Sequence, residues 1–236
     1  SEIYLDGTAL AGKATFSFDA EGNPEVKSVD EASETVALSG SFVEGGSYFI
    51  PVLPGTTETG NFHITIVTAD GNGLVATHPG SVTVPRKGGF HLEDRNTNFT
   101  ESFLIKDAAT LKTFLADAKN YVAGQHATII KDIDLTGETI TSAASFKGIL
   151  NGRNHSIKNW TSNGASLIKT LGDGGRIKNL NIDESCSLIP ARTGNFGFLA
   201  QTSNKYSVVE NCVNNADIDL NAETVDGFRI ASLVGV

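Results

Sequence analysis

The sequence has few of the residues that mark several other classes of protein. Its 236 residues include no methionine, two cysteines, six prolines and one tryptophan, and only 19% are charged. The low charge, together with a hydrophobic content of 39%, excludes an intrinsically disordered chain. No apolar run approaches the ~20 residues that a membrane-spanning helix needs. Because position 1 is not methionine, we expect that the natural N-terminus was removed, either with a secretion signal or by trimming.

Basic residues are also scarce. The net charge of −9 argues against a nucleic-acid or anionic-membrane partner, because phosphate binding needs clustered Lys and Arg. Residues 1–99 hold 13 acidic and 5 basic residues, and the remainder holds 14 and 13. This shift predicts two domains, residues 1–100 and 101–236. Cys186 and Cys212 are too few for a disulfide framework, so two buried thiols and a single disulfide both stay open.

The first hundred residues have the pattern of short strands separated by turns. Between residues 62 and 66, apolar residues alternate with His63 and Thr65, which predicts a strand with one buried face and these two side chains outward. Asp70-Gly71-Asn72-Gly73 follows and is a strong hairpin signal. We therefore expect an antiparallel β-sandwich over residues 1–100.

The second part predicts one helix and then a repeat. Leu111, Phe114 and Leu115 share one face of a helix over about 107–121, for which Asp107 is the expected N-cap. Downstream, a pattern of β-branched, charged, Asn and apolar residues recurs, and the longer of its two spacings is expected to hold a loop around 187–195. Its asparagines are Asn159, Asn179 and Asn211.

Such a repeat predicts a right-handed parallel β-helix, with these asparagines stacked as a ladder in its bends. The helix is then expected to cover the apolar end of the first coil, where unpaired strand edges would invite aggregation. At the other end, Val236 falls one strand into a coil. We expect that the natural protein continues beyond it, and the alternative is that another chain covers this end.

These motifs resemble the GLUG-type β-helix repeats of secreted and surface-displayed bacterial adhesin-like proteins. The resemblance covers about residues 103–236. It rests on Phe103–Phe114, Ile133–Gly137, Phe146–Gly148, Asn151–Ile157, Phe198-Leu199-Ala200 and Leu233-Val234-Gly235. The last two segments are similar to the family's Gly-Leu-Val-Gly signature but depart from it at Gln201 and Ile230.

A second resemblance, over about residues 38–94, is to the C-terminal half of a fimbrillin-like domain. It rests on Leu38-Ser39-Gly40, Tyr48-Phe49-Ile50, Pro54-Gly55, Phe62–Val67, Asp70-Gly71, Ser81–Val84 and Gly88. Such domains occur in pilus subunits and surface lipoproteins of Bacteroidetes-type bacteria. The resemblance implies an extracellular position on the outer-membrane surface and a lipid anchor at the N-terminus, which has been removed here.

Parallel β-helices often carry polysaccharide lyases and hydrolases, which act on sugars with paired carboxylates. The candidate catalytic carboxylates are Asp183, Glu184, Asp217 and Asp219. In the alternative of calcium-assisted proton abstraction, the base would be Arg153, Arg176 or Arg192. The competing interpretation, which we prefer, is that these charges form the solvated outer face of the coils. The five histidines lack metal-ligand spacing, so we expect neither a metal nor a cofactor.

A binding role requires less than catalysis. Tyr206 and Phe196 are the expected exposed rings for a sugar, whereas Trp160 is expected in the core. Our hypothesis is a non-catalytic cell-surface adhesin, with a β-sandwich stalk presenting a β-helix that binds a host or microbial glycan or surface protein. The alternatives are a carbohydrate-active enzyme with its site on the β-helix flank and a structural spacer.

Overall fold

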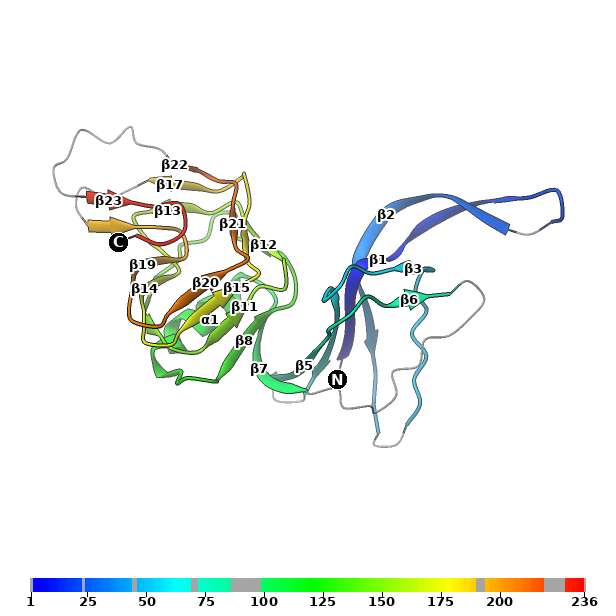
Figure 1. The fold of residues 1–236 in the computed structure, drawn as a ribbon, viewed down its shortest axis with the longest axis horizontal. Helices are drawn as coiled ribbons and strands as arrows, with labels where there is room; N and C mark the ends of the chain where they lie inside the picture. The colour runs from blue at the N-terminus through cyan, green and yellow to red at the C-terminus, as the bar shows by residue number, and fades with distance from the viewer. Residues whose placement is uncertain are drawn as a thin grey trace. The chain divides into compact units, whose positions relative to one another are not determined.

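A computed structural model of the chain has a mainly β fold with one short α-helix (Figure 1), which confirms the predicted class at that level. The structure describes residues 2–22, 24–43, 46–68, 72–85, 99–189, 194–218 and 228–235. The chain divides into two compact units, Ser1–Glu101 and Ser102–Val236. Each unit is described separately below.

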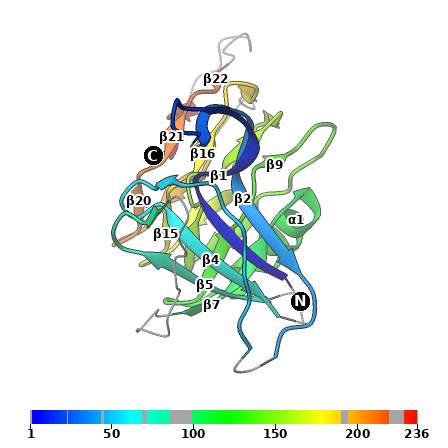
Figure 2. The same cartoon turned by 90° about the vertical axis from the view of Figure 1, so that its right-hand side faces the viewer.

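Unit 1 is built on an antiparallel sheet with the order β2-β1-β4-β5, visible in Figure 2. These strands are β1 (Glu2–Phe18), β2 (Pro24–Ser39), β4 (Phe62–Val67) and β5 (Asn72–His78). A short antiparallel pair joins β3 (Gly55–Thr56) to β6 (Thr83–Val84). One apolar cluster holds the unit together, and it consists of Leu5, Leu10, Phe62, Ile64 and Val82.

The predicted outward positions of β4 are wrong. His63 and Thr65 are buried, at 5% and 0% exposure. The reason lies in the register, which places Asp6 opposite His63 on one side of the strand and Thr77 opposite it on the other. His63 Nδ1 lies 2.8 Å from Thr77 Oγ1. This face therefore buries Asp6, His63 and Thr65, and His63 bonds to the exposed Thr77.

Unit 2 consists mainly of short parallel strands stacked on one another (Figure 1). The β11 stack holds β7 (Thr100–Ile105), β8 (His126–Ile129), β11 (Ile149–Asn151), β15 (Arg176–Lys178) and β20 (Val208–Glu210). The β12 stack holds β9 (Ile133–Asp134), β12 (Ser156–Lys158), β16 (Asn181–Ile182) and β21 (Val213–Asn214).

Two further stacks and one pair complete the unit. The β13 stack holds β13 (Thr161–Asn163), β17 (Ser187–Ile189) and β22 (Asp217–Ile218). The β14 stack holds β10 (Ala143–Phe146), β14 (Ile168–Leu171) and β19 (Ala200–Ser203). The additional pair joins β18 (Gly194–Phe196) to β23 (Phe228–Ile230).

The chain visits the stacks in the same order on each circuit, and the first circuit, with β9 and β10, has no strand in the β13 stack. In the β11 stack, Ile149 pairs with His126, Arg176 with Ile149, and Val208 with Arg176, so successive circuits take 23, 27 and 32 residues. The alternate positions face one common core, where side chains are fully buried at Leu150, Ile157, Ile168, Leu171, Ile177 and Ile182. Stacked, in-register strands of this kind lie about 4.8 Å apart.

The predicted asparagine ladder is only partly correct. Asn159, Asn179 and Asn211 all have left-handed backbone, with φ of 56°, 52° and 51°. Because Lys178 pairs with Glu210, Asn179 and Asn211 occupy equivalent positions after the β11 stack. Asn159 instead follows the β12 stack, where Lys158 pairs with Asp134. The spacing of 20 residues between Asn159 and Asn179 is therefore not a circuit.

Asn159 also bonds differently from the predicted ladder. Its side-chain Nδ2 donates to Asp134 Oδ1 at 3.0 Å, and its backbone N–H donates to Ser185 Oγ at 2.9 Å. Asn179 Nδ2 donates to Asn151 Oδ1 at 3.2 Å, one circuit away. The side chains of Asn159 and Asn179 therefore each bond to a residue of another circuit, but they do not bond to each other.

The prediction of a loop around 187–195 is also wrong in part. Ser187–Ile189 forms β17, which pairs with β13, and Gly194 begins β18. Residues 190–193 lie outside the described residues. The longer circuit therefore holds an additional strand.

Helix α1 (Ala108–Asp117) is followed by a 3₁₀ turn, η1 (Ala118–Asn120), and lies within the predicted range. Asp107 Oδ1 accepts bonds from Thr110 N–H and Thr110 Oγ1, both at 2.8 Å, and Thr110 Oγ1 accepts the Asp107 N–H at 3.1 Å. Leu111, Phe114 and Leu115 are buried in the core cluster. Phe114 lies edge-on to Phe146, with their ring centroids 5.4 Å apart.

We expect Asp107→Ala to lower the free energy of unfolding by about 1 kcal/mol, because it removes the N-cap of α1. Urea denaturation of the full chain measures this change. Asp173→Ala, at an exposed position in a turn, is the matched control. Equal stability of the two variants would show that the cap contributes nothing.

Gly152 occupies the position equivalent to Asn179 one circuit earlier, since Asn151 pairs with Lys178. A Cβ at Gly152 would lie 2.3 Å from the Asn179 carbonyl oxygen. We expect Gly152→Ala to cost about 1–3 kcal/mol of stability through overpacking. Thermal denaturation of this variant beside Gly40→Ala, whose Cβ would enter open space, tests the prediction.

Candidate functional site

The described candidate catalytic carboxylates lie on two stacks of unit 2. Asp183 directly follows β16 in the β12 stack, and the exposed Glu184 comes next. Asp217 begins β22 in the β13 stack and pairs with Ser187. Asp219 lies outside the described residues. Asp183 and Asp217 therefore belong to different sheets.

Asp183 is held by the turn that follows it. Its Oδ1 accepts bonds from Ser185 N–H at 3.0 Å and from Ser185 Oγ at 2.7 Å, and the Ser185 hydroxyl lowers the pKa of Asp183. Asp134 has the same arrangement with Thr136, at 2.8 Å and 2.6 Å. The Thr136 hydroxyl and then Asn159 lower the pKa of Asp134 to about 2. A general acid needs a raised pKa, so neither carboxyl suits that role.

A polar cluster that the sequence did not predict lies beside these turns. Asp132 accepts the Ser156 N–H at 2.9 Å, lies 3.4 Å from His155 Nδ1 and is paired with Lys158 Nζ at 2.6 Å. The hydrogen bond from His155, more than that from Lys158, holds the pKa of Asp132 well below its usual range despite partial burial. Asp132 also raises the pKa of Lys158. The cluster therefore joins neighbouring strands of the β12 stack.

His155 directly follows the turn at Arg153 and Asn154. It is 9% exposed, and its Nε2 is buried without a hydrogen-bond partner among the described residues. The residue before it, Asn154, has left-handed backbone with φ of 65°. The signal that could have found the cluster is circuit spacing, because the Ile133–Ile157 pairing brings Asp132 beside Ser156.

The two rings proposed as sugar platforms have different environments. Tyr206 is 76% exposed in the turn between β19 and β20, and Lys205 Nζ lies 5.1 Å from its ring centroid. Phe196 is 3% exposed and belongs to the core cluster, so its assignment as a surface ring is wrong. The sequence missed that Phe196 lies on a strand, β18, rather than in a loop.

Both cysteines are free thiols in the structure. Cys186 is buried and Cys212 is half-buried, and burial raises the pKa of both. Cys186 accepts the Trp160 N–H at 3.4 Å. A raised pKa keeps a thiol protonated and unreactive, so these residues act as packing groups.

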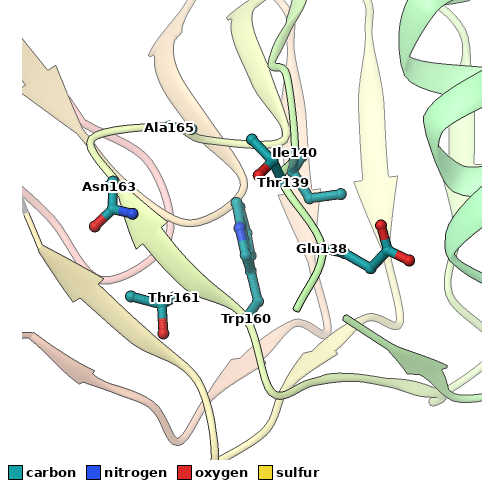
Figure 3. Close-up of a pocket in the computed structure, with 7 residues that line it drawn as sticks. All are labelled: Glu138, Thr139, Ile140, Trp160, Thr161, Asn163 and Ala165. Atoms are coloured by element: carbon teal, nitrogen blue, oxygen red, sulfur yellow. The ribbon is translucent and has the colours of Figure 1, made fainter. Parts of the chain in front are cut away.

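A small pocket among the described residues is shown in Figure 3. It lies at the edge of β13 that has no strand partner among the described residues, where the segment before β10 runs instead. Trp160 stands between this segment and β13 (Figure 3) and is 1% exposed, which confirms its core assignment. The lining residues are Glu138, Thr139, Ile140, Trp160, Thr161, Asn163 and Ala165.

The pocket is small and is lined by both polar and apolar groups. Its volume of about 130 Å³ is below the ~300–1,000 Å³ of typical small-molecule sites. Glu138, Thr161 and Asn163 are exposed and offer a carboxylate, a hydroxyl and an amide. The Glu138 carboxylate also pairs with Lys112 of α1. Such a pocket can contact one edge of a polar ligand but does not enclose the whole ligand.

The described residues contain no group of three or more His, Cys, Asp or Glu residues placed to hold a metal ion. Within the same part of the chain, no helix has the length and hydropathy that crossing a membrane requires. Comparisons with protein-family models, with curated proteins and with solved structures found no match.

We expect Asp132→Asn to lower the free energy of unfolding by about 1 kcal/mol near neutral pH, because Lys158 and His155 lose a charged acceptor that is partly exposed. The pKa of Asp132 is depressed in the folded state, so its contribution is complete above the unfolded pKa of about 3.9 and is lost as the pH falls below it. Urea denaturation at several pH values should show the gap from wild type narrowing below about pH 4. Asp173→Asn is the control, and a gap independent of pH would contradict the assignment.

Proposed function

We propose that unit 2 is a right-handed parallel β-helix and that unit 1 is a fimbrillin-like β-sandwich. The first proposal is supported by four parallel stacks visited in constant order and by their common buried core. The second is supported by the four-stranded antiparallel sheet, its apolar cluster and the short β3–β6 pair. In this arrangement α1 covers the apolar core of the first circuit.

The function that we infer is attachment without catalysis: a bacterial cell-surface adhesin that binds a glycan or a surface protein through the β-helix. The sequence resemblances supply the extracellular, outer-membrane setting. The pocket at the free edge of β13 is the observation that carries the binding role. It places hydroxyl, amide and carboxylate groups around a buried indole, and sugars are bound by this mixture of hydrogen-bonding and apolar groups.

Carboxylate chemistry favours binding over the enzymatic alternative. Asp132, Asp134 and Asp183 each accept bonds that stabilise the charged form, and their pKa values are lowered. A lyase or hydrolase needs a carboxyl or another group that exchanges a proton near the working pH. Asp134 and Asp183 are instead held as anions that close turns, and Asp132 as an anion that joins two circuits.

The small volume of the pocket favours weak binding at each site and attachment through many copies of the protein. A pocket of about 130 Å³ contacts one end of a glycan, and shallow contacts of this kind give low affinity per site. Attachment at a cell surface tolerates this weakness, because many copies act together and raise the effective affinity. The spacer alternative requires no ligand site, and the polar groups around Trp160 argue against it.

Binding at this pocket is directly measurable because Trp160 is the sole tryptophan of the chain. We expect a glycan selected from an array to change the emission of Trp160 on titration. Asn163→Ala should weaken this binding about 5–10-fold, because it removes one amide contact worth about 1–1.5 kcal/mol. Asp183→Asn, outside the pocket, should leave the affinity unchanged.

Three outcomes would reject this proposal. Release of reducing ends from the bound polysaccharide would show an enzyme. An array without any bound glycan or protein would favour the spacer. Binding that leaves both the Trp160 emission and the Asn163→Ala affinity unchanged would place the site elsewhere.

A further inference from the structure

Between two of its stacks unit 2 is basic, although the chain as a whole is acidic. Three turns, one above another, connect the β14 stack to the β11 stack in successive circuits. Over residues 143–151, 168–178 and 200–210, these turns and the strands beside them hold five basic and two acidic residues. The rest of the chain holds 13 basic and 25 acidic residues. The five basic residues are Lys147, Lys169, Arg176, Lys178 and Lys205.

Most of these positive charges have no acidic neighbour to balance them. Lys178 has Glu210 beside it on the next strand, and the other four basic residues are exposed. Within the part of the chain that the structure describes, none of the five forms an ion pair. Unbalanced charges of one sign raise the local potential and attract a ligand of the opposite sign. The ligand that fits here is therefore an anion.

The turns bring three of these basic residues to neighbouring positions. A Cβ added at Gly172 would lie 2.8 Å from Lys147 Cγ, so the Lys147 side chain extends across the turn of the next circuit. In that turn the Gly174 N–H donates to the Lys205 carbonyl oxygen at 3.3 Å, which joins it to the third turn. Arg176 directly follows the middle turn and begins β15. Steps of about 4.8 Å separate successive turns, so one extended ligand can reach all three cations.

Tyr206 adds an exposed aromatic ring to the third turn. The residue is 76% exposed, and Lys205 Nζ lies 5.1 Å from its ring centroid. Its backbone is left-handed, with φ of 60°, at the position that Gly174 occupies one circuit earlier with φ of 73°. Bulky side chains rarely adopt this conformation, which suits glycine and asparagine. The turn therefore holds a strained tyrosine whose ring is largely outside the core, and such strain is commonly retained at functional sites.

The chemistry of this group, which we call the basic corner (Lys147, Arg176, Lys205 and Tyr206), matches an acidic polysaccharide. An exposed tyrosine ring offers an apolar face to a sugar ring while its hydroxyl stays in water. Ammonium and guanidinium groups form strong hydrogen bonds with carboxylates and sulfates. A thin polysaccharide contacts the corner alone, whereas a membrane or a nucleic-acid duplex would also approach the acidic remainder of the chain.

We propose that the basic corner binds an acidic polysaccharide, with a sugar ring against Tyr206 and with carboxylates or sulfates on Lys147, Arg176 and Lys205. This site lies between the β14 and β11 stacks, whereas the proposed glycan pocket lies at the free edge of β13. The two sites share no residue, so either proposal can fail without the other.

Biolayer interferometry of the full chain with polygalacturonate, dextran sulfate and uncharged dextran tests the proposal. We expect the two anionic polymers to bind and dextran not to bind. Because binding releases counterions, both affinities should fall about tenfold or more between ~50 and ~200 mM salt. Lys205→Gln should weaken binding several-fold and reduce this salt dependence. Lys106→Gln, which removes the same charge from an exposed position after β7, is the matched control and should change neither.

A substitution of Tyr206 separates binding from folding. Tyr206→Asn removes the ring and supplies a residue that adopts left-handed backbone, as Asn179 and Asn211 do. We expect binding to weaken about 5–10-fold and the midpoint of thermal unfolding to be no lower than that of wild type. Asn163→Ala, which alters the β13 pocket, should leave the affinity for both anionic polymers unchanged.

Several results would overturn the proposal. These are the absence of binding to both anionic polymers at low salt, equal binding of dextran, and affinities that neither Lys205→Gln nor Tyr206→Asn changes. An equal loss in Lys106→Gln would show a response to net charge alone, and a lower unfolding midpoint of Tyr206→Asn would give the ring a structural role. Tighter binding of single-stranded DNA or anionic vesicles, lost in the same variants, would assign the corner to that partner instead.

Discussion

Main-chain hydrogen bonds between successive circuits are the constraint on which unit 2 depends. In the β11 stack, Leu150 pairs with Ile177 and Ile177 with Val209, so each inward residue rests on another. A slip of one residue would turn these side chains outward, because side chains alternate along a strand. The register is therefore fixed by the buried core, and differences in circuit length occur between strands.

The corners between stacks show how this constraint uses polar residues. At Asp134 and Asp183 a carboxylate accepts the N–H and the hydroxyl of the residue two positions on, which closes a turn in the backbone. At Asn159 an amide joins the circuits on either side. Carboxylates committed in this way are stabilised as anions. The residue type that suggested catalysis in the sequence therefore has a structural role here.

Local patterns predicted the elements that depend on local interactions. Alternation located β4 at Phe62–Val67, and the Asp107 cap with the Leu111–Leu115 spacing located α1. The position of Asn159 could not be predicted in this way, because the same four-residue pattern occurs at two different corners. The two corners differ in the pairing of the preceding lysine, because Lys158 pairs with Asp134 whereas Lys178 pairs with Glu210. Such pairings join residues more than twenty positions apart.

The burial of His63 and Phe196 was missed for a related reason. From its own segment of the sequence, His63 was predicted at an outward strand position and Phe196 in a loop. The environment of each residue is set by other strands. His63 lies between Asp6 and Thr77, and Phe196 lies on β18 beside β23. The Asp132, His155 and Lys158 cluster likewise joins two circuits. A single sequence indicates the strands more readily than the neighbours that bury their side chains.

The pocket follows from an interruption of the same regular stacking. The β11, β12 and β14 stacks begin with β7, β9 and β10, but the β13 stack begins one circuit later, with β13. In the missing position runs the segment containing Glu138, Thr139 and Ile140, which cannot cover the β13 edge as a strand would. Trp160, Thr161 and Asn163 therefore meet a loop rather than a sheet. Binding residues commonly lie on loops held by a rigid scaffold, because a loop can change without disturbing the register below it. In the site that we propose, the Glu138–Ile140 segment is therefore the part that can change without disturbing the register, and β13 is the part that the register fixes.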